Sequence, residues 1–303
     1  MGPLVSVRQM LSLIRFIHTV FALPFALFAA VMAWVANAHA RPPWPWRWQE
    51  LAGIMVCMVG ARSAAMAINR IADRRWDAQN PRTATRHLPA GLVRLATVVW
   101  FSIASCLLFL FGTALFLPNH LPLYLALPVL IFLVGYSYSK RFTAWTHFYL
   151  GAALGLAPVA SWIAIRGQQV VRAPSDLLPA VVLGAAVMSW VAGFDLIYAC
   201  QDAAFDRRVG LSSIPARWGI ARALRLAALC HLGTIVLLAL LPLSFPTLGW
   251  IYVSGIVAVA LLLIYEHALV RPDDLTRVNL AFFHVNAILS IGLFVVGTLD
   301  LLL

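Results

Sequence analysis

Charged residues are scarce in this sequence of 303 residues, and acidic residues are scarcer still. Asp, Glu, Lys and Arg together make up 11% of the chain, and 11 residues are acidic, whereas about 25% of the residues of a typical soluble domain are charged. Hydrophobic residues make up 62% of the chain, and the mean hydropathy is +0.89. This composition excludes a soluble globular domain, and we expect an all-α integral membrane protein.

Cysteine is also rare, with four residues in the chain. None of them forms a C-x-x-C pair, and all lie within or at the ends of apolar segments. This pattern excludes a disulfide framework and a cysteine-based metal site, so we interpret the cysteines as small apolar core residues. They are Cys57, Cys106, Cys200 and Cys230.

Long apolar runs are abundant, and each is close to the roughly 20 residues that a helix needs to cross the hydrocarbon layer. They predict a single membrane domain over residues 1–303, a bundle of about nine transmembrane helices with a central cavity. The stretch "ANAHA" at 36–40 resembles a signal-peptidase site, but the apolar run before it is longer than a signal peptide requires, so we expect this helix to be retained. The predicted spans are 14–36, 50–69, 93–117, 121–139, 145–165, 178–200, 221–242, 247–269 and 280–302.

The net charge of +11 could suggest a nucleic-acid partner, but the basic residues punctuate the apolar spans and form no stripe on a soluble domain. We therefore expect no nucleic acid. Arg62 lies inside the second span. Seventeen of the other basic residues lie on one side of the predicted membrane: Arg8, Arg15, Arg70, Arg74, Arg75, Arg82, Arg86, Arg94, Lys140, Arg141, Arg207, Arg208, Arg217, Arg222, Arg225, Arg271 and Arg277. The remaining four lie on the other side: Arg41, Arg47, Arg166 and Arg172. The positive-inside rule predicts a multi-pass protein of the cell (inner) membrane, with a cytoplasmic N-terminus and an external C-terminus.

The few acids are concentrated in two places. Residues i and i+4 of a helix lie one above the other, so the four-residue spacing after the second span predicts one polar stripe. A second group at spacings of seven and four begins within the sixth span and continues beyond its end. Both spans run in the same direction, so the two groups can face each other across the bundle. The first group is Asn69, Asp73 and Asp77, and the second is Asp195, Asp202 and Asp206.

Carboxylates one turn apart repel each other, and the penalty grows near the membrane unless a cation lies between them. Oxygen ligands without His or Cys suit Mg²⁺, which proteins hold through one or two carboxylates together with substrate phosphates. The neighbouring arginines fit phosphate as well, because Arg pairs with phosphate oxygens in a bidentate way. We therefore predict a Mg²⁺-bridged diphosphate at the cytoplasmic face, with an apolar tail running into the bundle.

The simpler interpretation is that these aspartates only neutralise nearby arginines at the headgroup level. Two clusters with helical spacing at one face favour the binding site over this interpretation. Arg62 points along the stripe of Asn69 but two turns deeper, where an unpaired Arg costs at least about 2.5 kcal/mol. We expect Arg62 to face a polar cavity or an anion, with a purely structural buried pair as the alternative.

Several motifs together resemble the UbiA superfamily of intramembrane aromatic prenyltransferases. They are the Asn69-x3-Asp73-x3-Asp77 motif followed by "NPRTATRHLPAG", then "YSYSKR" at 136–141 and "GFDLIYACQDAAFDRRVGLSSIPARWG" at 193–219. The resemblance covers nearly the whole chain and includes the order of the motifs and the helix count.

The resemblance implies an enzyme that binds a polyprenyl diphosphate through Mg²⁺ and transfers the prenyl chain to an aromatic carboxylate. It implies Asp73, Asp77, Asp202 and Asp206 as metal ligands and catalytic residues, with Asp195 as a further catalytic member of the second motif. It also implies diphosphate binding by Asn69, Arg82, Arg86, Lys140 and Arg141, and acceptor binding by Arg62 and Tyr198. The rings of Tyr136, Tyr138 and Tyr198 could stabilise an allylic cation, although tyrosines at helix ends are commonly interface anchors.

The second motif resembles that of the 4-hydroxybenzoate group of ubiquinone synthesis, so 4-hydroxybenzoate is the expected acceptor. The stretches "HTVFALPFA" at 18–26 and "SIPARWG" at 213–219 resemble a sister group of the futalosine route to menaquinone, whose acceptor is 1,4-dihydroxy-6-naphthoate. Both acceptors carry a carboxylate, so Arg62 does not separate them. His18 is a further candidate for an acceptor contact, and His147, His231 and His284 are interpreted as structural residues. A transporter of a cation or phosphate compound and a structural membrane scaffold are the alternative classes.

Overall fold

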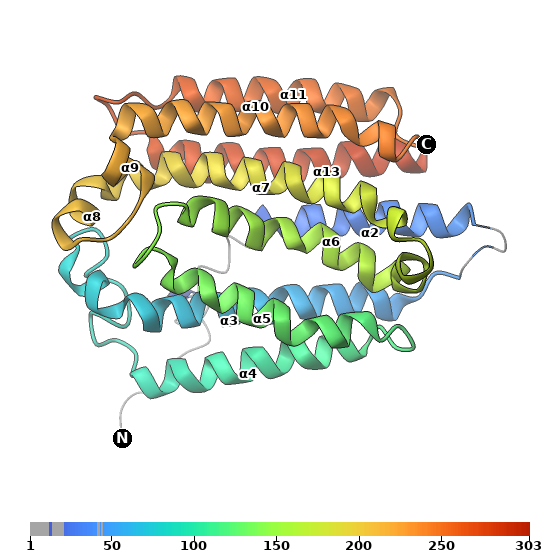
Figure 1. Cartoon of the computed structure of the whole chain (residues 1–303), viewed down its shortest axis with the longest axis horizontal. Coiled ribbons are helices and arrows are strands. Elements are labelled where there is room, and N and C mark those ends of the chain that lie inside the picture. The colour runs from blue at the N-terminus through green and yellow to red at the C-terminus, as the bar shows by residue number, and fades with distance from the viewer. Residues whose placement is uncertain (1–11, 14–20, 41–42, 44) are drawn as a thin grey trace.

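A computed structural model describes residues 12–13, 21–40, 43 and 45–303, and these residues form helices joined by short loops (Figure 1). His18 and the start of the first predicted span lie outside the described residues. The long helices are α2 (Leu23–Ala38), α3 (Trp48–Gln79), α4 (Leu95–Ala114), α5 (Leu121–Ser139), α6 (Thr146–Arg172), α7 (Leu178–Ala199), α10 (Ile220–Ser244), α11 (Trp250–Ala268) and α13 (Asn286–Leu302). The short ones are η2 (Pro174–Leu177), η3 (Cys200–Asp202), α8 (Ala203–Val209), α9 (Ile214–Trp218), α12 (Val278–Leu280) and η4 (Ala281–Val285).

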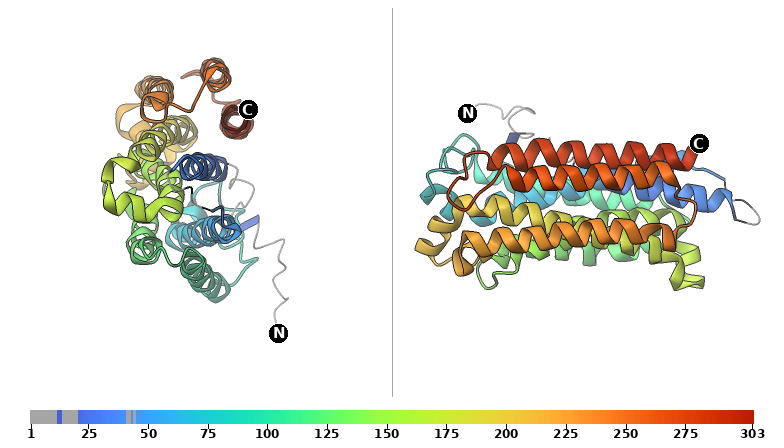
Figure 2. Two further views of the ribbon diagram at one scale, coloured as in Figure 1. Left: turned by 90° about the vertical axis from the view of Figure 1, so that its right-hand side faces the viewer. Right: turned by 90° about the horizontal axis from the view of Figure 1, so that it is seen from above.

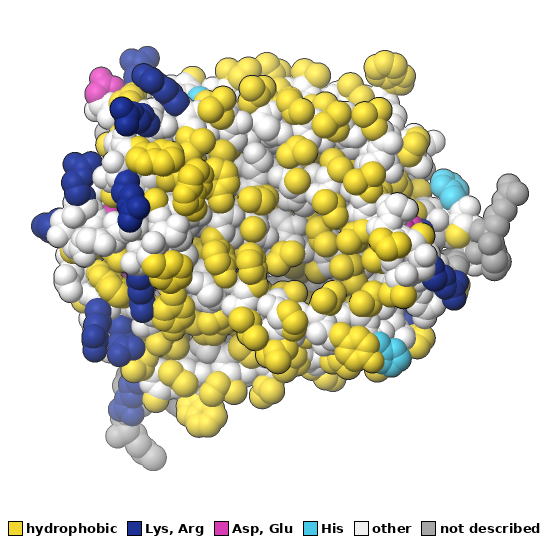
Figure 3. All heavy atoms as spheres, in the orientation of Figure 1, with side chains coloured by type: hydrophobic (Ala, Val, Ile, Leu, Met, Phe, Trp, Pro, Cys, Tyr) yellow, Lys and Arg dark blue, Asp and Glu magenta, His cyan; other side chains and the backbone are white. Residues whose placement is uncertain are grey.

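The all-helical membrane architecture expected from the sequence is confirmed. Within the described part of the chain, eight helical segments are long and apolar enough to cross a membrane, and α2 adds a shorter apolar helix of 16 residues. Figure 3 shows hydrophobic side chains over the middle of the face in view, with Lys and Arg gathered mainly at one end. This surface is the one that a hydrocarbon belt between two polar layers requires.

The helices run roughly along one long axis. Seen along this axis, α11 and α13 lie at one side and α4 at the other, with α2 and α3 between them (Figure 2). Helices α6 and α7 pack closely because glycines face each other: a Cβ on Gly155 would lie 2.5 Å from the carbonyl oxygen of Gly184. Small residues permit this close approach of backbones, which substitutes for the hydrophobic effect inside a membrane.

Helix α3 extends ten residues beyond the end predicted for the second span and has 32 residues in all. Such a helix is about 48 Å long, well beyond the roughly 30 Å of hydrocarbon. It ends at Asn80, whose backbone is extended (ψ 116°), because the following Pro81 disfavours the α conformation at the residue before it. The extension keeps Asn69, Asp73 and Asp77 on one continuous helix, as the spacing predicts.

The second acid group differs from the expected continuous stripe. Helix α7 ends at Ala199, the turn tightens into a 3-10 segment at η3, and α8 starts in a new direction before it ends at Gly210 with φ 73°. The backbone N–H of Ser212 donates to the carbonyl oxygen of Lys140 at 2.7 Å, which fixes the loop after α8 against the end of α5. Asp195 therefore lies on α7 itself, whereas Asp202 and Asp206 lie beyond its end.

Helices α3, α5 and α7 all end at the same end of the bundle, which also carries α8 and α9 (Figure 1). We call the end that holds Gln79, Ser139 and Ala199 the motif end, and the end that holds Ala38, Arg172 and Leu302 the far end. The second and sixth predicted spans run in the same direction, as expected, and both acid groups therefore lie at one end of the molecule.

Candidate active site

A cavity of about 210 Å³ opens at the motif end. Helices α3, α5, α6 and α7 and the segment η3–α8 contribute to its wall, together with the loop after α3. Twelve residues predicted from the sequence to bind the metal, the diphosphate or the acceptor line this one cavity: Arg62, Asn69, Asp73, Asp77, Arg82, Arg86, Lys140, Arg141, Asp195, Tyr198, Asp202 and Asp206. Tyr136 lines it as well, whereas Tyr138 is not among the lining residues.

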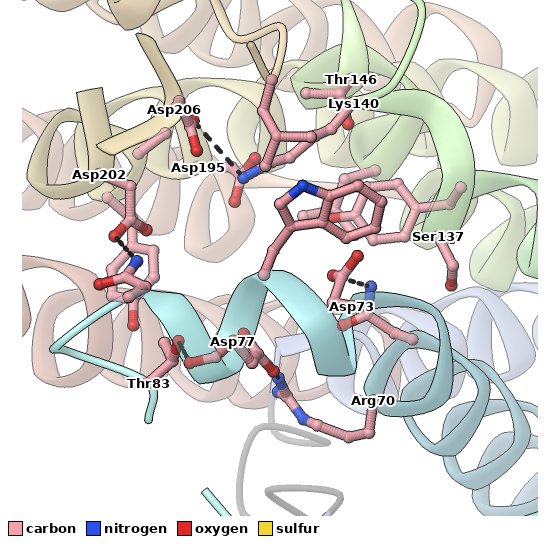
Figure 4. A pocket seen from close by; sticks show the side chains of 18 of the residues that line it. Arg70, Asp73, Asp77, Thr83, Ser137, Lys140, Thr146, Asp195, Asp202 and Asp206 are labelled. Atoms are coloured by element: carbon pink, nitrogen blue, oxygen red, sulfur yellow. Dashed lines mark hydrogen bonds and ion pairs between the residues drawn. The ribbon is translucent and has the colours of Figure 1, made fainter. Parts of the chain in front are cut away.

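The first acid group lies along α3. Asn69 donates from its side-chain amide to Asp73 at 3.0 Å. Asp77 is buried and accepts a hydrogen bond from Arg86 at 2.6 Å through Oδ1, and its Oδ2 lies 3.6 Å from Arg70 Nη1. That second oxygen is buried without a hydrogen-bond partner, so Asp77 retains unused capacity to bind a cation or a donor (Figure 4).

The loop after α3 joins the first acid group to the second. Asn80 donates to Asp202 Oδ1 at 3.0 Å, and Arg82 Nε donates to the same oxygen at 2.9 Å. A further Arg82 nitrogen, Nη2, donates to Asp202 Oδ2. The contacts span more than a hundred residues of sequence, and they bring Asp202 beside the end of α3.

Arg82 also contacts Tyr198. Its Nη1 donates to the Tyr198 hydroxyl at 2.7 Å, and its guanidinium carbon lies 5.0 Å from the centroid of the ring. Burial opposes the positive charge of Arg82, but the hydrogen bond to Asp202 and the neighbouring groups outweigh it and raise the pKa of Arg82 above its ordinary value. Arg82 is therefore a permanent cation at the centre of the site.

Lys140 follows α5 and faces the second acid group. Its Nζ lies 3.9 Å from Asp206 Oδ2, a buried oxygen without a hydrogen-bond partner. Burial favours the neutral amine, but the charges of Asp206, Asp195, Asp202 and Asp73 outweigh burial and raise the pKa of Lys140 above 10.5. A cation held by this many carboxylates is positioned to meet an anion that enters the cavity (Figure 4).

Arg141 lies at the wall of the cavity and has a structural set of partners. Its guanidinium stacks over the rings of Trp76 at 4.7 Å and Tyr138 at 4.5 Å, and Nη2 donates to the carbonyl oxygen of Ala72 at 3.0 Å. These contacts fix the guanidinium against α3, so any phosphate contact by Arg141 would start from this restrained position.

The deeper part of the cavity is apolar. Phe21, Phe194 and Phe282 line it, and the ring of Phe282 lies 4.3 Å from that of Tyr198. Arg62 lines the cavity and lies two turns before Asn69 on α3, on the side away from the motif end. Its guanidinium therefore lies beside the aromatic wall. A polar mouth above an aromatic interior suits a molecule with an anionic head and an apolar tail.

Several lining residues escaped the sequence analysis. The letters around the first motif contain a signal for one of them: Asn80 stands between the end of α3 and Pro81, and polar residues just after a helix end commonly satisfy groups at that end. Ser137 and Thr146 gave no such signal, because isolated hydroxyl residues are common in apolar helices. The additional polar lining residues are Arg70, Asn80, Thr83, Ser137 and Thr146.

The donor atoms fit a cation that arrives together with phosphate. In the described part of the chain, no three His, Cys, Asp or Glu side chains lie close enough to form a ready-made metal centre. What the site offers is oxygen donors in two pairs, with orphaned oxygens on Asp77 and Asp206, and several cations for phosphate. Mg²⁺ retains much of its coordination from water and substrate phosphates, so it does not need a complete protein cage.

Comparison with known proteins gives the same family. The sequence model of the UbiA prenyltransferase family matches residues 19–288. A 4-hydroxybenzoate octaprenyltransferase from Thiobacillus denitrificans is 31% identical over 252 residues, which cover 83% of this chain and 80% of that protein. The same-named enzyme from Cupriavidus metallidurans is 32% identical over 257 residues, which cover 84% of this chain and 81% of that enzyme.

Solved structures agree in fold. The apo structure of a UbiA homolog from Aeropyrum pernix superimposes with a TM-score of 0.81 at 31% identity, covering 98% of this chain and 99% of that chain. A UbiA homolog from Archaeoglobus fulgidus bound to DMAPP and Mg²⁺ superimposes with a TM-score of 0.71 at 18% identity, covering 97% of this chain and 99% of that chain. Together with the family match, these likenesses show that the protein belongs to the UbiA prenyltransferase family.

Proposed function

We propose that the protein transfers a polyprenyl chain from a polyprenyl diphosphate to a ring carbon of an aromatic carboxylate and releases diphosphate, with Mg²⁺ as cofactor. The observation that carries the proposal is the single cavity in which two acid groups and several cations face each other above an aromatic interior. The relatives named as 4-hydroxybenzoate octaprenyltransferases support 4-hydroxybenzoate as the acceptor.

In this proposal the polar mouth holds the head of the donor. Asp73, Asp77, Asp202 and Asp206 would hold Mg²⁺, which when bound supplies electrostatic stabilisation of the charge on the leaving diphosphate. The fixed cations supply the same kind of stabilisation from the protein side. The residues that would contact the diphosphate are Asn69, Arg82, Arg86, Lys140 and Arg141.

Arg82 and Arg86 each pair with an acid of the site, Arg82 with Asp202 and Arg86 with Asp77. Arg has five N–H donors, so each guanidinium can contact a phosphate oxygen while it keeps part of its bond to the carboxylate. The pairs thus keep the acids and cations at working distance before the donor binds, which reduces the reorganisation needed at the moment of reaction.

The aromatic interior would hold the reacting carbons. The bond between the allylic carbon and the diphosphate oxygen breaks, and its electron pair leaves with the diphosphate. The acceptor ring supplies the electron pair of the new C–C bond and then loses its proton. Tyr198 and the neighbouring phenylalanines present ring faces that stabilise an allylic cation, and Arg62 would pair with the carboxylate of the acceptor.

The position of the acids distinguishes the enzyme from the alternative classes. A transporter is expected to hold its polar site near mid-depth, between broken helices. Here Asp73, Asp77, Asp202 and Asp206 lie at the motif end, and the structural scaffold alternative leaves their convergence on one cavity unexplained.

An assay on purified membranes tests the proposal. Membranes that contain the protein are incubated with Mg²⁺, a polyprenyl diphosphate and either 4-hydroxybenzoate or 1,4-dihydroxy-6-naphthoate, and the prenylated product is identified by mass spectrometry. We expect prenylated 4-hydroxybenzoate. Product from the naphthoate alone would move the acceptor to the menaquinone route, and no product with either compound would refute the proposal.

We further propose that the motif end faces the cytoplasm and that the C-terminus lies outside the inner membrane. The Lys and Arg side chains gathered at the motif end support this orientation (Figure 3). Single cysteines placed at Arg208 and at Leu303 in a cysteine-free variant would test it. In intact cells, a membrane-impermeant thiol reagent should label the cysteine at 303 and not the one at 208, and the reverse pattern would refute the orientation.

A further inference from the structure

His147 is a buried histidine whose partner lies in the site. It occupies the second position of α6, its side chain is 0% exposed, and its Nδ1 lies 2.7 Å from Asp195 Oδ2. Asp195 lines the cavity, whereas His147 lies behind it. No sequence pattern joins the two residues, because they lie 48 positions apart on different helices.

The surroundings of this histidine indicate which of its ring nitrogens donates. Its other ring nitrogen, Nε2, is buried without a hydrogen-bond partner. An orphaned N–H in such a place costs more than an orphaned lone pair on a weak acceptor. The tautomer with the proton on Nδ1 fits this condition, and it donates to the Asp195 carboxylate.

Asp195 is oriented from two sides. His147 holds one of its oxygens from α6, and Lys140 and Tyr136 lie close enough for electrostatic interaction with it from α5 and its end. Figure 4 shows the Asp195 carboxylate beside Lys140 in the cavity. A carboxylate held in this way, between the polar mouth and the aromatic interior, faces the region where the acceptor ring would react.

We propose that His147 is a positioning residue that holds Asp195 as the group that takes the ring proton of the acceptor. The proposal rests on the proposed function. After the new C–C bond has formed, the electron pair of the ring C–H bond returns to the ring, and the proton passes to Asp195. A ring protonated at carbon is a strong acid, so a carboxylate suffices to take its proton, and the placement of that carboxylate decides the rate.

A ring-deuterated acceptor tests this assignment, using whichever acceptor the wild-type membranes prenylate. His147→Phe keeps an aromatic ring and removes the donor, and we expect it to lower kcat by about 100-fold while KM for the diphosphate stays within about threefold. Proton removal then limits turnover, so deuterium at the prenylated carbon slows the variant and leaves the wild type unaffected. His147→Asn restores a donor near the position of Nδ1 and should recover most of the activity and abolish the isotope effect.

Two further variants separate a positioning role from a structural one. In the Asp195→Asn background, His147→Phe should cause no additional loss, because residues that act through one another are not additive. His231→Asn removes a second buried histidine, which does not line the cavity. In the wild type, His231 Nδ1 lies 2.9 Å from His267 Nε2. The His231→Asn variant should change the thermal midpoint without producing an isotope effect.

The outcomes are distinguishable. If wild-type membranes prenylate neither acceptor, the proposed function fails. If the wild type is active and a folded His147→Phe shows normal kcat, or shows a loss without an isotope effect, the assignment of His147 is overturned. Failure of His147→Asn to recover activity would overturn it as well, since the donor function alone is what the structure assigns.

Discussion

Ion pairs at the two ends of the bundle differ in how completely their acids are bound. At the far end, Arg166 donates to both oxygens of Asp176, and Trp162 donates to one of them at 3.0 Å. Arg166 also donates to Asn37 at 2.6 Å. The pair closes this end of the bundle with each carboxylate oxygen satisfied.

At the motif end, two aspartates each have a carboxylate oxygen that accepts no hydrogen bond. Asp77 and Asp206 each have a buried oxygen without a hydrogen-bond partner, and the nearest cations lie at 3.6 Å and 3.9 Å. An unsatisfied buried carboxylate oxygen destabilises the fold, so the retention of these two oxygens in one cavity points to a ligand that completes them. An ion pair alone therefore does not indicate a binding site, whereas an ion-paired aspartate with an unsatisfied buried oxygen does.

The largest expected effect is on catalysis at the motif end. Asp73→Ala and Asp202→Ala should each lower the rate of prenyl transfer by about 1000-fold or more, because each removes an oxygen donor aimed at the metal and diphosphate. Turnover per folded protein, normalised by size-exclusion chromatography in detergent, measures the loss. An equal loss of turnover in an Asp176→Ala variant would contradict the assignment of catalysis to the motif end.

The next effect is on stability at the far end. Asp176→Ala leaves Arg166 buried without its main partner, so we expect a loss of about 3–5 kcal/mol in the free energy of unfolding. Thermal midpoints in detergent measure it. Asp73→Asn is the matched control, since it relieves the repulsion between Asp73 and Asp77 one turn apart, and its midpoint without ligand should not fall.

A smaller effect concerns ligand binding. Mg²⁺ with inorganic diphosphate should stabilise the wild type by about 2.7 kcal/mol at a concentration of 100 times Kd. The shift should vanish in Asp202→Asn and persist in an Asp176→Asn variant that still folds. Stabilisation of both variants to the same extent would place the diphosphate away from the motif end.

The smallest effect is the response to alkaline pH. Neighbouring aspartates raise the pKa of Lys140 above its ordinary value, so the ammonium is charged below this raised pKa and loses its charge only as the pH rises through it. KM for the polyprenyl diphosphate should therefore change by less than about twofold between about pH 7.5 and about pH 9.5. An alkaline rise in KM that disappears in Lys140→Arg would show that Lys140 loses its proton within this range.

Much of the architecture could be predicted from the sequence because hydropathy alone sets where a helix can cross a membrane. Eight of the nine predicted spans correspond to α3–α7, α10, α11 and α13, and the four-residue spacing of Asn69, Asp73 and Asp77 places them on one face of α3. The predicted second span ends ten residues before α3 does, because the apolar run ends at Asn69. The polar residues that follow continue the helix along the polar cavity.

The kink in α6 was equally hidden. Arg166 was predicted in a loop, but it lies inside α6 with non-helical angles (φ −113°, ψ 19°). Asn119, from a distant loop, donates to the carbonyl oxygens of Ile163 and Ala164 at 2.8 Å and 2.9 Å and so satisfies groups beside the kink. A buried kink needs such partners, and a single sequence does not show which distant residue supplies them.

The class of the protein, the positions of most of its membrane helices and the acids that line the cavity follow from the sequence, because these depend on local composition and on helical periodicity. Only the tertiary structure decided which groups meet. Arg82 binds Asp202 across 120 positions, and His147 binds Asp195 across 48. Such pairs depend on how helices pack and where their ends turn, as the break at η3 illustrates, and packing is a property of the whole chain.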